Sequence, residues 1–199
     1  MSGIITDNLG RSSGLVKAAG GGAVPDWERI SHQTASNDTE IDFTSFSADY
    51  IDFKIIGTNY VQATDNTDLL FRVSVGGTFQ DGASDYQYAA LGYDEDNNER
   101  RNYSSGAGII RPTHLGVGSL LAAGEVASFE WILYDVHSTT YQKLSSFKAC
   151  YLTYGNNMEF LTGAARFQQA SNAVDGARIY AASGNIDVGE FTLYGRKIT

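Results

Sequence analysis

The sequence predicts an all-β protein: an antiparallel, jelly-roll-like β-sandwich preceded by an extended N-terminal arm. Its 199 residues include twelve Tyr and ten Phe but only two Pro, a composition that favours pleated, half-buried surfaces. Its 22 Gly suit many tight turns. Short segments of alternating apolar and polar residues recur along the chain, separated by turn residues, and no regular series of helical segments lies between them.

The chain divides into residues 1–22, a predicted attachment arm, and residues 23–199, the predicted sandwich. The arm places Ser, Gly, Asn and Asp around a few apolar residues and ends on Gly20, Gly21 and Gly22. Ordering the backbone of the arm costs about 1–2 kcal/mol per residue in conformational entropy. Burial of the few apolar side chains of the arm cannot offset this cost. We therefore expect it to order only against another chain, with a frayed terminus as the alternative. The candidate anchor residues are Ile4, Ile5, Leu9, Leu15 and Val16.

Three strands are expected in the first half of the sandwich. Residues 40–44, 51–55 and 69–75 each alternate apolar with polar side chains. The polar stretch Thr58–Asp68 is the predicted connection between the second and the third of them.

The sequence of the second half of the sandwich predicts further strands and one long loop. Strands are expected around residues 86–90, 129–133, 147–153 and 158–167. Residues 94–108 are too polar and glycine-rich for a core strand and are the predicted longest loop. Residues 120–125 give the only helical hint.

The C-terminal segment 176–195 predicts a β-hairpin. Two alternating stretches flank the turn residues Ser183, Gly184 and Asn185. Two strands alone bury too little surface, so the hairpin needs a second sheet. The expected core residues are Ile51, Phe53, Leu69, Phe71, Val73, Trp131, Leu133, Phe147, Ile179, Phe191 and Leu193.

Composition and charge exclude several functional classes. The formal net charge of −9 disfavours contact with nucleic acid and with anionic membrane surfaces. No apolar run approaches the roughly 18 residues of a membrane helix, so no membrane insertion is expected. One cysteine excludes an internal disulfide framework. The start of the chain lacks the pattern of a signal peptide, so we expect synthesis in a cytoplasm.

The spacing of Asp94, Asp96 and Asn98 resembles the start of a calcium-binding loop, but the positions that follow do not fit one. Alternate carboxyl groups on a tight coil can converge on one cation. However, Glu99 stands where the sharp turn needs glycine, and Ser105 where a bidentate acid is needed. The segment is therefore interpreted as a solvated loop, and no metal or other cofactor is predicted.

No catalytic motif is found. Asp135 and His137 could share one face at a strand end, but no motif places a nucleophile beside them. A glycan-processing enzyme would need two carboxylates about 5–9 Å apart, for which only the loose pair Glu130 and Asp135 is available. Cys150 is interpreted as a small packing residue. We therefore expect no enzymatic activity.

Aromatic residues at predicted strand edges, polar faces and loops are the candidate surface or interface residues. Such rings can pack against a neighbouring subunit, stack on a sugar, or simply lie at the surface, and these alternatives remain open. The candidates are Trp27, Tyr86, Tyr88, Tyr103, Tyr154, Tyr180 and Tyr194.

Four segments of the chain resemble segments of small virion or tail-fibre proteins of tailed bacteriophages. They are SGIITDNLGRSSGLVKA, QDGASDYQYAALG, GVGSLLAAGE and YAASGNIDVGEFTLYG. The resemblance spans most of the chain and implies a virion component with an N-terminal attachment arm and a β-sandwich head. It brings no catalytic residues with it. This chain departs from the group at residues 94–101, which are more charged than the Ser and Gly loop expected there.

The expected function is therefore that of a phage structural protein, a tail fibre or other fibre attached through its arm. Its expected partners are other virion proteins, further copies in a trimer, and a host-surface glycan. The alternative is a capsid decoration protein, because fold does not fix function. A glycan-processing enzyme is the third, less favoured interpretation.

Overall fold

The computed structural model describes residues 27–197 except residue 115 and residues 119–123. Eight strands form a large antiparallel sheet: β1 (Glu28–Asp38), β3 (Tyr50–Gln62), β6 (Tyr86–Asp94), β7 (Glu99–Ala107), β8 (Ala127–Tyr134), β9 (Lys143–Leu152), β10 (Met158–Phe167) and β12 (Ile186–Lys197). Four form a small sheet: β2 (Glu40–Thr44), β4 (Leu69–Val75), β5 (Thr78–Phe79) and β11 (Gly176–Ala181).

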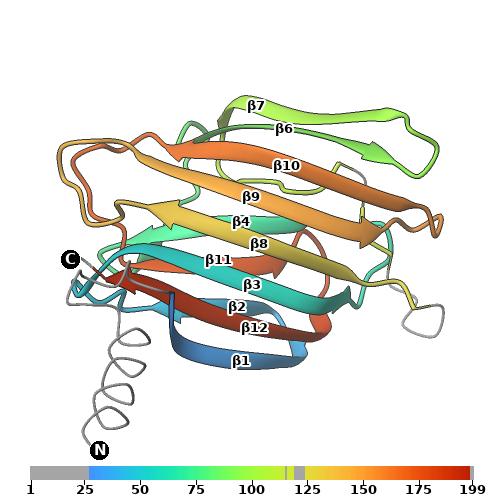
Figure 1. Ribbon diagram of the computed structural model, residues 1–199, viewed down its shortest axis with the longest axis horizontal. Helices are drawn as coiled ribbons and strands as arrows, with labels where there is room; N and C mark the ends of the chain where they lie inside the picture. Colours follow the sequence, from blue (N-terminus) through green and yellow to red (C-terminus); the bar gives the residue numbers. More distant parts are fainter. Residues whose placement is uncertain (1–26, 115, 119–123, 198–199) are drawn as a thin grey trace, which may run out of the picture.

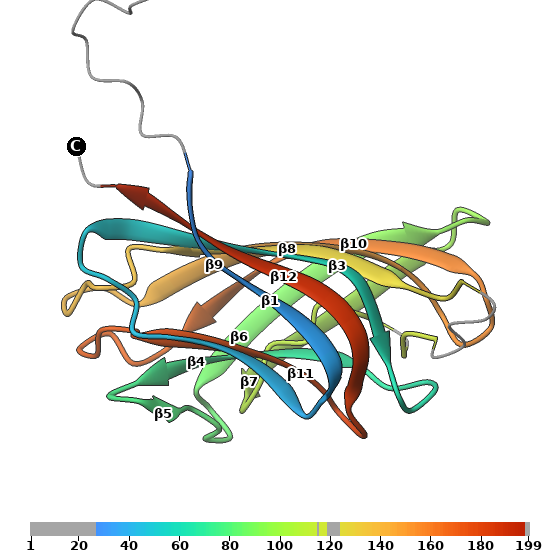
Figure 2. The same cartoon turned by 90° about the horizontal axis from the view of Figure 1, so that it is seen from below.

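The two sheets lie face to face, so the prediction of an antiparallel β-sandwich is confirmed (Figure 1). The order is β1-β12-β3-β8-β9-β10-β6-β7 in the large sheet and β2-β11-β4-β5 in the small one. Figure 2 shows the two layers from the side, with β4, β5 and β11 beneath β3, β8 and β9 of the large sheet. Within the described residues no helix is long and apolar enough to cross a membrane.

The core lies between the sheets and is built on aromatic contacts. Phe71 of β4 stacks on Trp131 of β8, with ring centroids 4.5 Å apart and planes 12° apart. Phe129 packs against the same Phe71 ring at 5.0 Å. Side chains alternate along each strand, so one face of each sheet enters this layer. Every expected core residue is buried except Ile51, which is half-buried.

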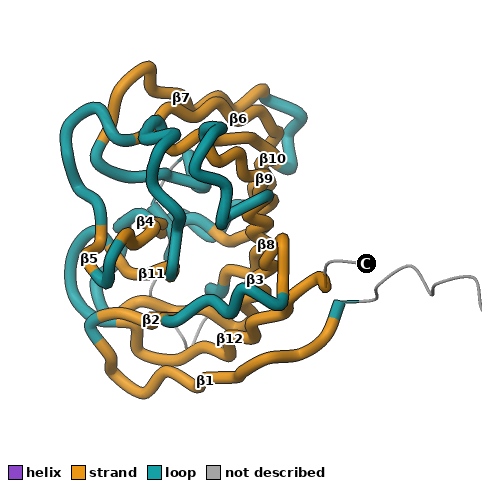
Figure 3. The backbone as a smooth tube through the Cα atoms, turned by 90° about the vertical axis from the view of Figure 1, so that its left-hand side faces the viewer, coloured by secondary structure: helices purple, strands orange, loops and turns teal. Residues whose placement is uncertain are grey.

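Residues 108–114 and 116–118 cover part of the inner face of the large sheet that the small sheet leaves open. Ile110 forms an isolated bridge with Phe71, and Val117 bridges both Thr67 and Thr153. Figure 3 shows loop segments lying beside β6, β7 and β10 on the inner side of the large sheet. This path brings Arg111 and His114 to the inner side of the large sheet.

The predicted C-terminal hairpin is wrong. β11 pairs with β2 and β4 in the small sheet, whereas β12 pairs with β1 and β3 in the large sheet. The turn between them carries the chain from one layer to the other. It is held by Ala182 N–H to Asp68 O and by Ala63 N–H to Asn185 O. Gly184 has φ +74°, a conformation that glycine adopts without strain.

Three further elements differ from the sequence predictions. Most of the predicted loop 94–108 is strand β7, which pairs with β6 and forms one edge of the large sheet. Strand β1, at the other edge, was not predicted, because its sequence ERISHQTASND is mostly polar and its side chains are mostly exposed. β3 continues to Gln62, into the stretch predicted as a connection. The helical hint at residues 120–125 falls largely outside the described residues.

Candidate assembly surface

The outer face of the large sheet, turned away from the small sheet, exposes large apolar side chains. Phe160 is 44% exposed between the buried Glu159 and Leu161, so it points outward from β10. Leu91 and Tyr93 of β6 alternate in the same way with buried neighbours. Contiguous exposed apolar surface of this kind is typical of interaction sites. Further exposed members of this face are Tyr103, Tyr134, Leu144 and Met158.

Cross-strand pairing makes part of this surface contiguous. Phe160 lies opposite Cys150 of β9 on one side and Tyr93 of β6 on the other. The Phe160 and Tyr93 ring centroids are 6.2 Å apart. Leu91 and Met158 lie next to this row along β6 and β10. We refer to Leu91, Tyr93, Cys150, Met158 and Phe160 as the apolar patch.

A shallow groove of about 430 Å³ adjoins the apolar patch between β3, β8, β9 and β10. It exists because small residues interrupt the outer face. Ser128 and Cys150, with short side chains, lie on this face beside the larger Phe160. The Lys148 ammonium and the Glu130 carboxylate, 3.1 Å apart, lie in its wall. We call this feature the outer groove; its outward side chains include Ile56, Thr58, Ser128, Cys150, Phe160 and Thr162.

Cys150 is exposed in the outer groove, so its interpretation as a packing residue is wrong. Ala149 and Tyr151, its neighbours on β9, are buried and point to the core. Because side chains alternate along a strand, Cys150 faces the opposite way.

Trp27, the first residue of the described part, contacts the outer face of the large sheet. The Lys54 ammonium lies 4.6 Å from the Trp27 ring centroid and 5.4 Å from that of Tyr194. Lys54 pairs with Tyr194 on β12 and Ile132 on β8, and its neighbours Phe53 and Ile55 are buried. Cation–π contacts of this kind contribute about 0.5–1 kcal/mol each at exposed sites. Trp27 and Tyr194 are thus both half-buried.

The prediction that Tyr86 and Tyr88 lie at the surface is wrong. Tyr86 is 0% exposed; its hydroxyl donates to Gln80 O at 3.1 Å and accepts from Val73 N–H at 3.0 Å. Burial raises the pKa of both phenols. The alternation was predicted correctly, but these rings occupy its inner side, on β6.

The remaining candidates are distributed over different parts of the molecule. Tyr103 is 76% exposed on the outer side of edge strand β7, and Tyr154 is exposed in the turn after β9. Tyr180 is half-buried in the small sheet, with the Arg72 guanidinium 5.1 Å from its ring centroid. The anchor candidates Ile4, Ile5, Leu9, Leu15 and Val16 lie outside the described residues.

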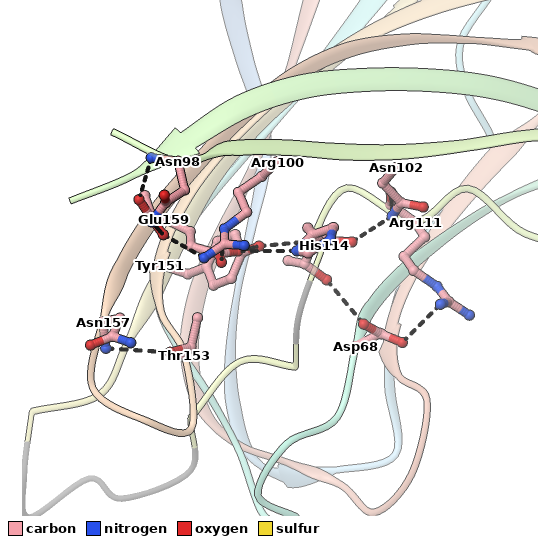
Figure 4. A network of polar contacts seen from close by, with 12 residues as sticks. Asp68, Asn98, Arg100, Asn102, Arg111, His114, Tyr151, Thr153, Asn157 and Glu159 are labelled. Atoms are coloured by element: carbon pink, nitrogen blue, oxygen red, sulfur yellow. Dashed lines mark hydrogen bonds and ion pairs between the residues drawn. The ribbon is translucent and has the colours of Figure 1, made fainter. Parts of the chain in front are cut away.

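Behind the apolar patch, on the inner face, a polar network holds β7, β9 and β10 together (Figure 4). Glu159 is 1% exposed, and its carboxylate accepts a hydrogen bond from the Tyr151 hydroxyl at 2.6 Å. Arg100 Nε lies 3.1 Å from Glu159 Oε1, and His114 Nδ1 lies 3.9 Å from Oε2. The His114 N–H donates to the Tyr151 hydroxyl at 2.8 Å. A buried carboxylate needs such partners to offset its desolvation.

This network was missed from the sequence because its members are far apart in the chain. One signal was available: Glu159 falls on the inward face of β10 together with Leu161, Ala165 and Phe167. A carboxylate in that position requires a buried partner. With almost no exposed surface, Glu159 is out of reach of a substrate, so its effect is to fix the strands that carry Phe160 and Met158.

A second ion pair lies beside this network. Arg111 Nη1 is 3.3 Å from Asp68 Oδ2, and the Thr113 hydroxyl is 3.5 Å from Asp68 Oδ1. Burial raises the pKa of the Asp68 carboxyl, and the Arg111 charge opposes that shift.

The Asp94–Asn98 segment forms the β6–β7 turn. The Asp94 carboxylate accepts hydrogen bonds from Asp96 N–H and from the backbone and side chain of Asn98, and it pairs with Arg100. These contacts, the Asn98 side chain first, lower the pKa of Asp94. Within the described residues no group of three metal-ligating side chains gathers at one place.

Asp135 and His137 take part in local packing contacts. The Asp135 N–H donates to the Asp52 carboxylate at 2.9 Å, and Asp135 has φ 47°. His137 Nε2 lies 3.1 Å from the Ser47 carbonyl oxygen. Asp52 in turn forms an ion pair with Arg196.

No family model and no curated protein matches the chain. Two solved structures resemble it over most of its length. The infectious bursal disease virus VP2 subviral particle is 12% identical, with 84% of this chain and 40% of that chain covered and a TM-score of 0.14. The Gx strain of the same virus is 11% identical, with 85% and 36% covered and a TM-score of 0.15. The chain thus spans about two fifths of the length of these structures, and likeness at such TM-scores carries no weight for function.

Proposed function

We propose that this protein is a structural component of a bacteriophage virion, a tail fibre or other fibre attached through residues 1–22. The observation that carries the assembly role is the apolar patch, held on a rigid sheet by the buried Glu159 network. Exposing Phe160, Met158 and Leu91 to water is unfavourable, and contact with another subunit removes that cost. The resemblance of the sequence to phage virion proteins supports the choice of particle.

The protein acts in this proposal as an oligomer, a trimer, with the apolar patch as a subunit contact. A capsid decoration protein is the alternative, since it would use the same kind of surface. Exposed aromatic residues such as Tyr103 are available for a host-surface glycan.

The role proposed is non-catalytic. Of the carboxylates considered for glycan hydrolysis, Glu130 pairs with Lys148, and Asp135 lies in a turn after β8. Turnover of a host polysaccharide by the purified protein, lost in Glu130→Ala or Asp135→Ala, would overturn this part of the proposal.

The test combines a map of the particle with two variants. A cryo-EM map of the parent virion should place this chain at a fibre or decoration position with the apolar patch against a neighbour. The double variant Leu91→Asp and Phe160→Asp should fold but fail to assemble, because charges would be buried in the contact. Tyr141→Asp, at a more exposed aromatic position (70%) in the turn between β8 and β9, away from the apolar patch, is the control. Full incorporation of the double variant would refute the proposed contact.

A further inference from the structure

A shallow depression on the outer face of the large sheet lies toward the other end of β6 and β10 from the Phe160–Tyr93 pair. Its floor is a row of small side chains: Ala89 of β6 lies opposite Ala164 of β10, which lies opposite Ser146 of β9. Its volume is about 330 Å³, at the lower end of the range of ligand sites. We call it the alanine trough; its lining includes Gln87, Ala89, Leu144, Ala164 and Arg166.

The width of the alanine trough follows from the spacing of side chains on β10. Thr162 and Arg166 point outward on either side of Ala164, and four residues along a strand span about 13 Å. The methyl group of Ala164 does not fill the space between these two longer side chains. A flat six-membered ring can therefore lie over the floor with longer side chains at its edges.

Tyr103 of edge strand β7 stands beside this floor. It pairs with Ala89 of β6, so the Cβ atoms of the two residues are about 5 Å apart. Ala89 ends at its Cβ and leaves the phenol ring uncovered, and Tyr103 is 76% exposed. An open aromatic ring beside a flat, largely apolar floor suits the C–H groups of a sugar ring.

Among the described residues that line the alanine trough, only Arg166 carries a charge. Its Nη1 group donates to Gln142 Oε1 at 3.0 Å, and Gln142 Nε2 donates to Gln168 O at 3.2 Å, so the guanidinium is held in place. The described part of the chain gives Arg166 no carboxylate partner, and its Nε is buried without a hydrogen-bond partner. A fixed, unpaired guanidinium favours a ligand with a carboxylate.

Gln87 adds a neutral polar group next to this cation. It lies opposite Arg166 on the neighbouring strand, and its Nε2 donates to Ser105 O at 2.6 Å. This bond leaves the Gln87 Oε1 atom as an acceptor for a hydroxyl group. One end of the trough thus offers a charged donor and a neutral acceptor, which suits a ligand that carries both carboxylate and hydroxyl groups.

We infer that the alanine trough binds an acidic saccharide, with Tyr103 stacked on a sugar ring and Arg166 paired with a carboxylate of the uronic-acid type. The inference rests on the host-glycan part of the proposed function and adds to it a site and a chemical class of glycan. The Phe160–Tyr93 pair lies four residues further along β10 and β6, about 13 Å away. A subunit contact centred on that pair therefore leaves the trough accessible.

Binding to the purified full-length protein tests the inference, with tetragalacturonate as the probe and isothermal titration calorimetry as the measurement. Arg166→Gln should raise Kd about tenfold, as expected for the loss of one charged hydrogen-bonded contact. Tyr103→Ala should raise Kd about threefold to tenfold through lost stacking. This second variant, at a highly exposed position, keeps the inference testable if Arg166→Gln is unstable.

Two control variants change the same residue types away from the alanine trough. Arg29→Gln alters an exposed arginine on β1 at the opposite edge of the sheet, and Tyr154→Ala alters an exposed tyrosine in the turn after β9. Both should bind tetragalacturonate with the wild-type Kd. No binding by the wild type, or a wild-type Kd in both Arg166→Gln and Tyr103→Ala, would overturn the inference.

Two further probes define the class of ligand. Maltotetraose has sugar rings without carboxylates, and tetraglutamate has carboxylates without sugar rings; each should bind at least about tenfold more weakly than tetragalacturonate. Equal binding of maltotetraose would overturn the role of Arg166, and equal binding of tetraglutamate would overturn the assignment to a saccharide. A dimer that forms with rising concentration and is lost in Tyr103→Ala would instead assign the trough to a second copy.

The inference and the proposed function can fail separately. A protein that enters particles but does not bind tetragalacturonate would overturn the inference and leave the virion role standing. A protein that binds tetragalacturonate but is absent from the particle would overturn the virion role alone.

Discussion

Arg100 of β7 and Glu159 of β10 form an ion pair across the intervening strand β6, with Arg100 Nε 3.1 Å from Glu159 Oε1. The cross-strand partner of Arg100 on β6 is Gly92, which has no side chain to separate the two groups. Edge strand β7 is therefore tied to the sheet by a buried charge pair as well as by its backbone ladder.

The first prediction concerns this ion pair. Arg100→Met should lower the free energy of unfolding by about 2–3 kcal/mol, because it leaves the Glu159 carboxylate buried without the Arg100 charge and also removes the pair with Asp94. The partial exposure of Arg100 keeps the loss below the cost of a fully buried pair. Arg101→Met removes an exposed pair with Glu99 on the same strand and should cost less than about 1 kcal/mol. Urea denaturation of both variants measures the difference. Equal losses would show that burial of Glu159 is not what makes the pair important.

The second prediction concerns the aromatic core. Phe71→Ala should cost about 3–5 kcal/mol, because it removes the ring stacked on Trp131 and leaves a cavity. Phe160→Ala makes the same chemical change on the outer face and should cost far less in the isolated protein. Thermal and urea unfolding should rank the two in this order, and the reverse order would contradict the assignment of inner and outer faces.

The third prediction concerns two carboxyl groups whose pKa values are shifted in opposite directions in the folded protein. Burial raises the pKa of Asp68 above its ordinary 3.8, whereas hydrogen bonds from Asn98 lower that of Asp94 below 3.8. Asp68 therefore contributes most to stability at low pH, and this contribution is lost as the pH rises through its folded pKa. The Asp94 contribution is present above pH 3.8 and is lost as the pH falls through its lowered pKa.

NMR titration of the carboxyl carbons, assigned with Asp68→Asn and Asp94→Asn, should give these two directions. The stability of the wild type relative to Asp68→Asn should fall as the pH rises above 3.8. A pKa for Asp68 at or below 3.8 would show that the Arg111 charge outweighs burial.

The fourth prediction concerns assembly. Deletion of residues 1–22 should leave a folded, soluble sandwich that no longer enters particles, since the deleted segment carries the proposed attachment residues. Light scattering of the full-length protein should give a trimer. Particles that incorporate the truncated protein at full occupancy would refute attachment through the arm, and a monomer both in solution and in protein extracted from particles would refute the trimer.

Sequence periodicity predicted most strands of this fold because burial imposes a local pattern. Phe71 and Val73, or Trp131 and Leu133, alternate with residues of the other face, and this pattern depends only on the strand itself. Strand β7 lacks the signal: Arg100 and Asn102 point inward, where Glu159 and the carbonyl groups of Arg111 and Thr113 satisfy them. These hydrogen-bond and ion-pair partners lie on segments distant in the sequence, so they become apparent only in the folded structure.

The local sequence pattern also could not predict which face of a strand is buried or which strands pair with each other. Tyr86 and Tyr88 alternate as expected, but alternation alone does not say which side is buried. The segments of β11 and β12 follow each other closely with turn residues between them, as in a hairpin, although they belong to different sheets. The apolar patch could be predicted only in part, because it combines side chains from β6, β9 and β10.

The placement of β11 and β12 bears on how the protein is made. β12 separates β1 from β3, and β11 separates β2 from β4, so neither sheet can be completed until the last two strands have been synthesised. The earlier strands therefore keep unpaired edges until β11 and β12 have been synthesised. Folding of the sandwich should consequently be completed only after β12 has been synthesised, and it should be slow, because its contacts join distant segments. A premature stop before residue 176 would leave an insoluble chain rather than a smaller sandwich.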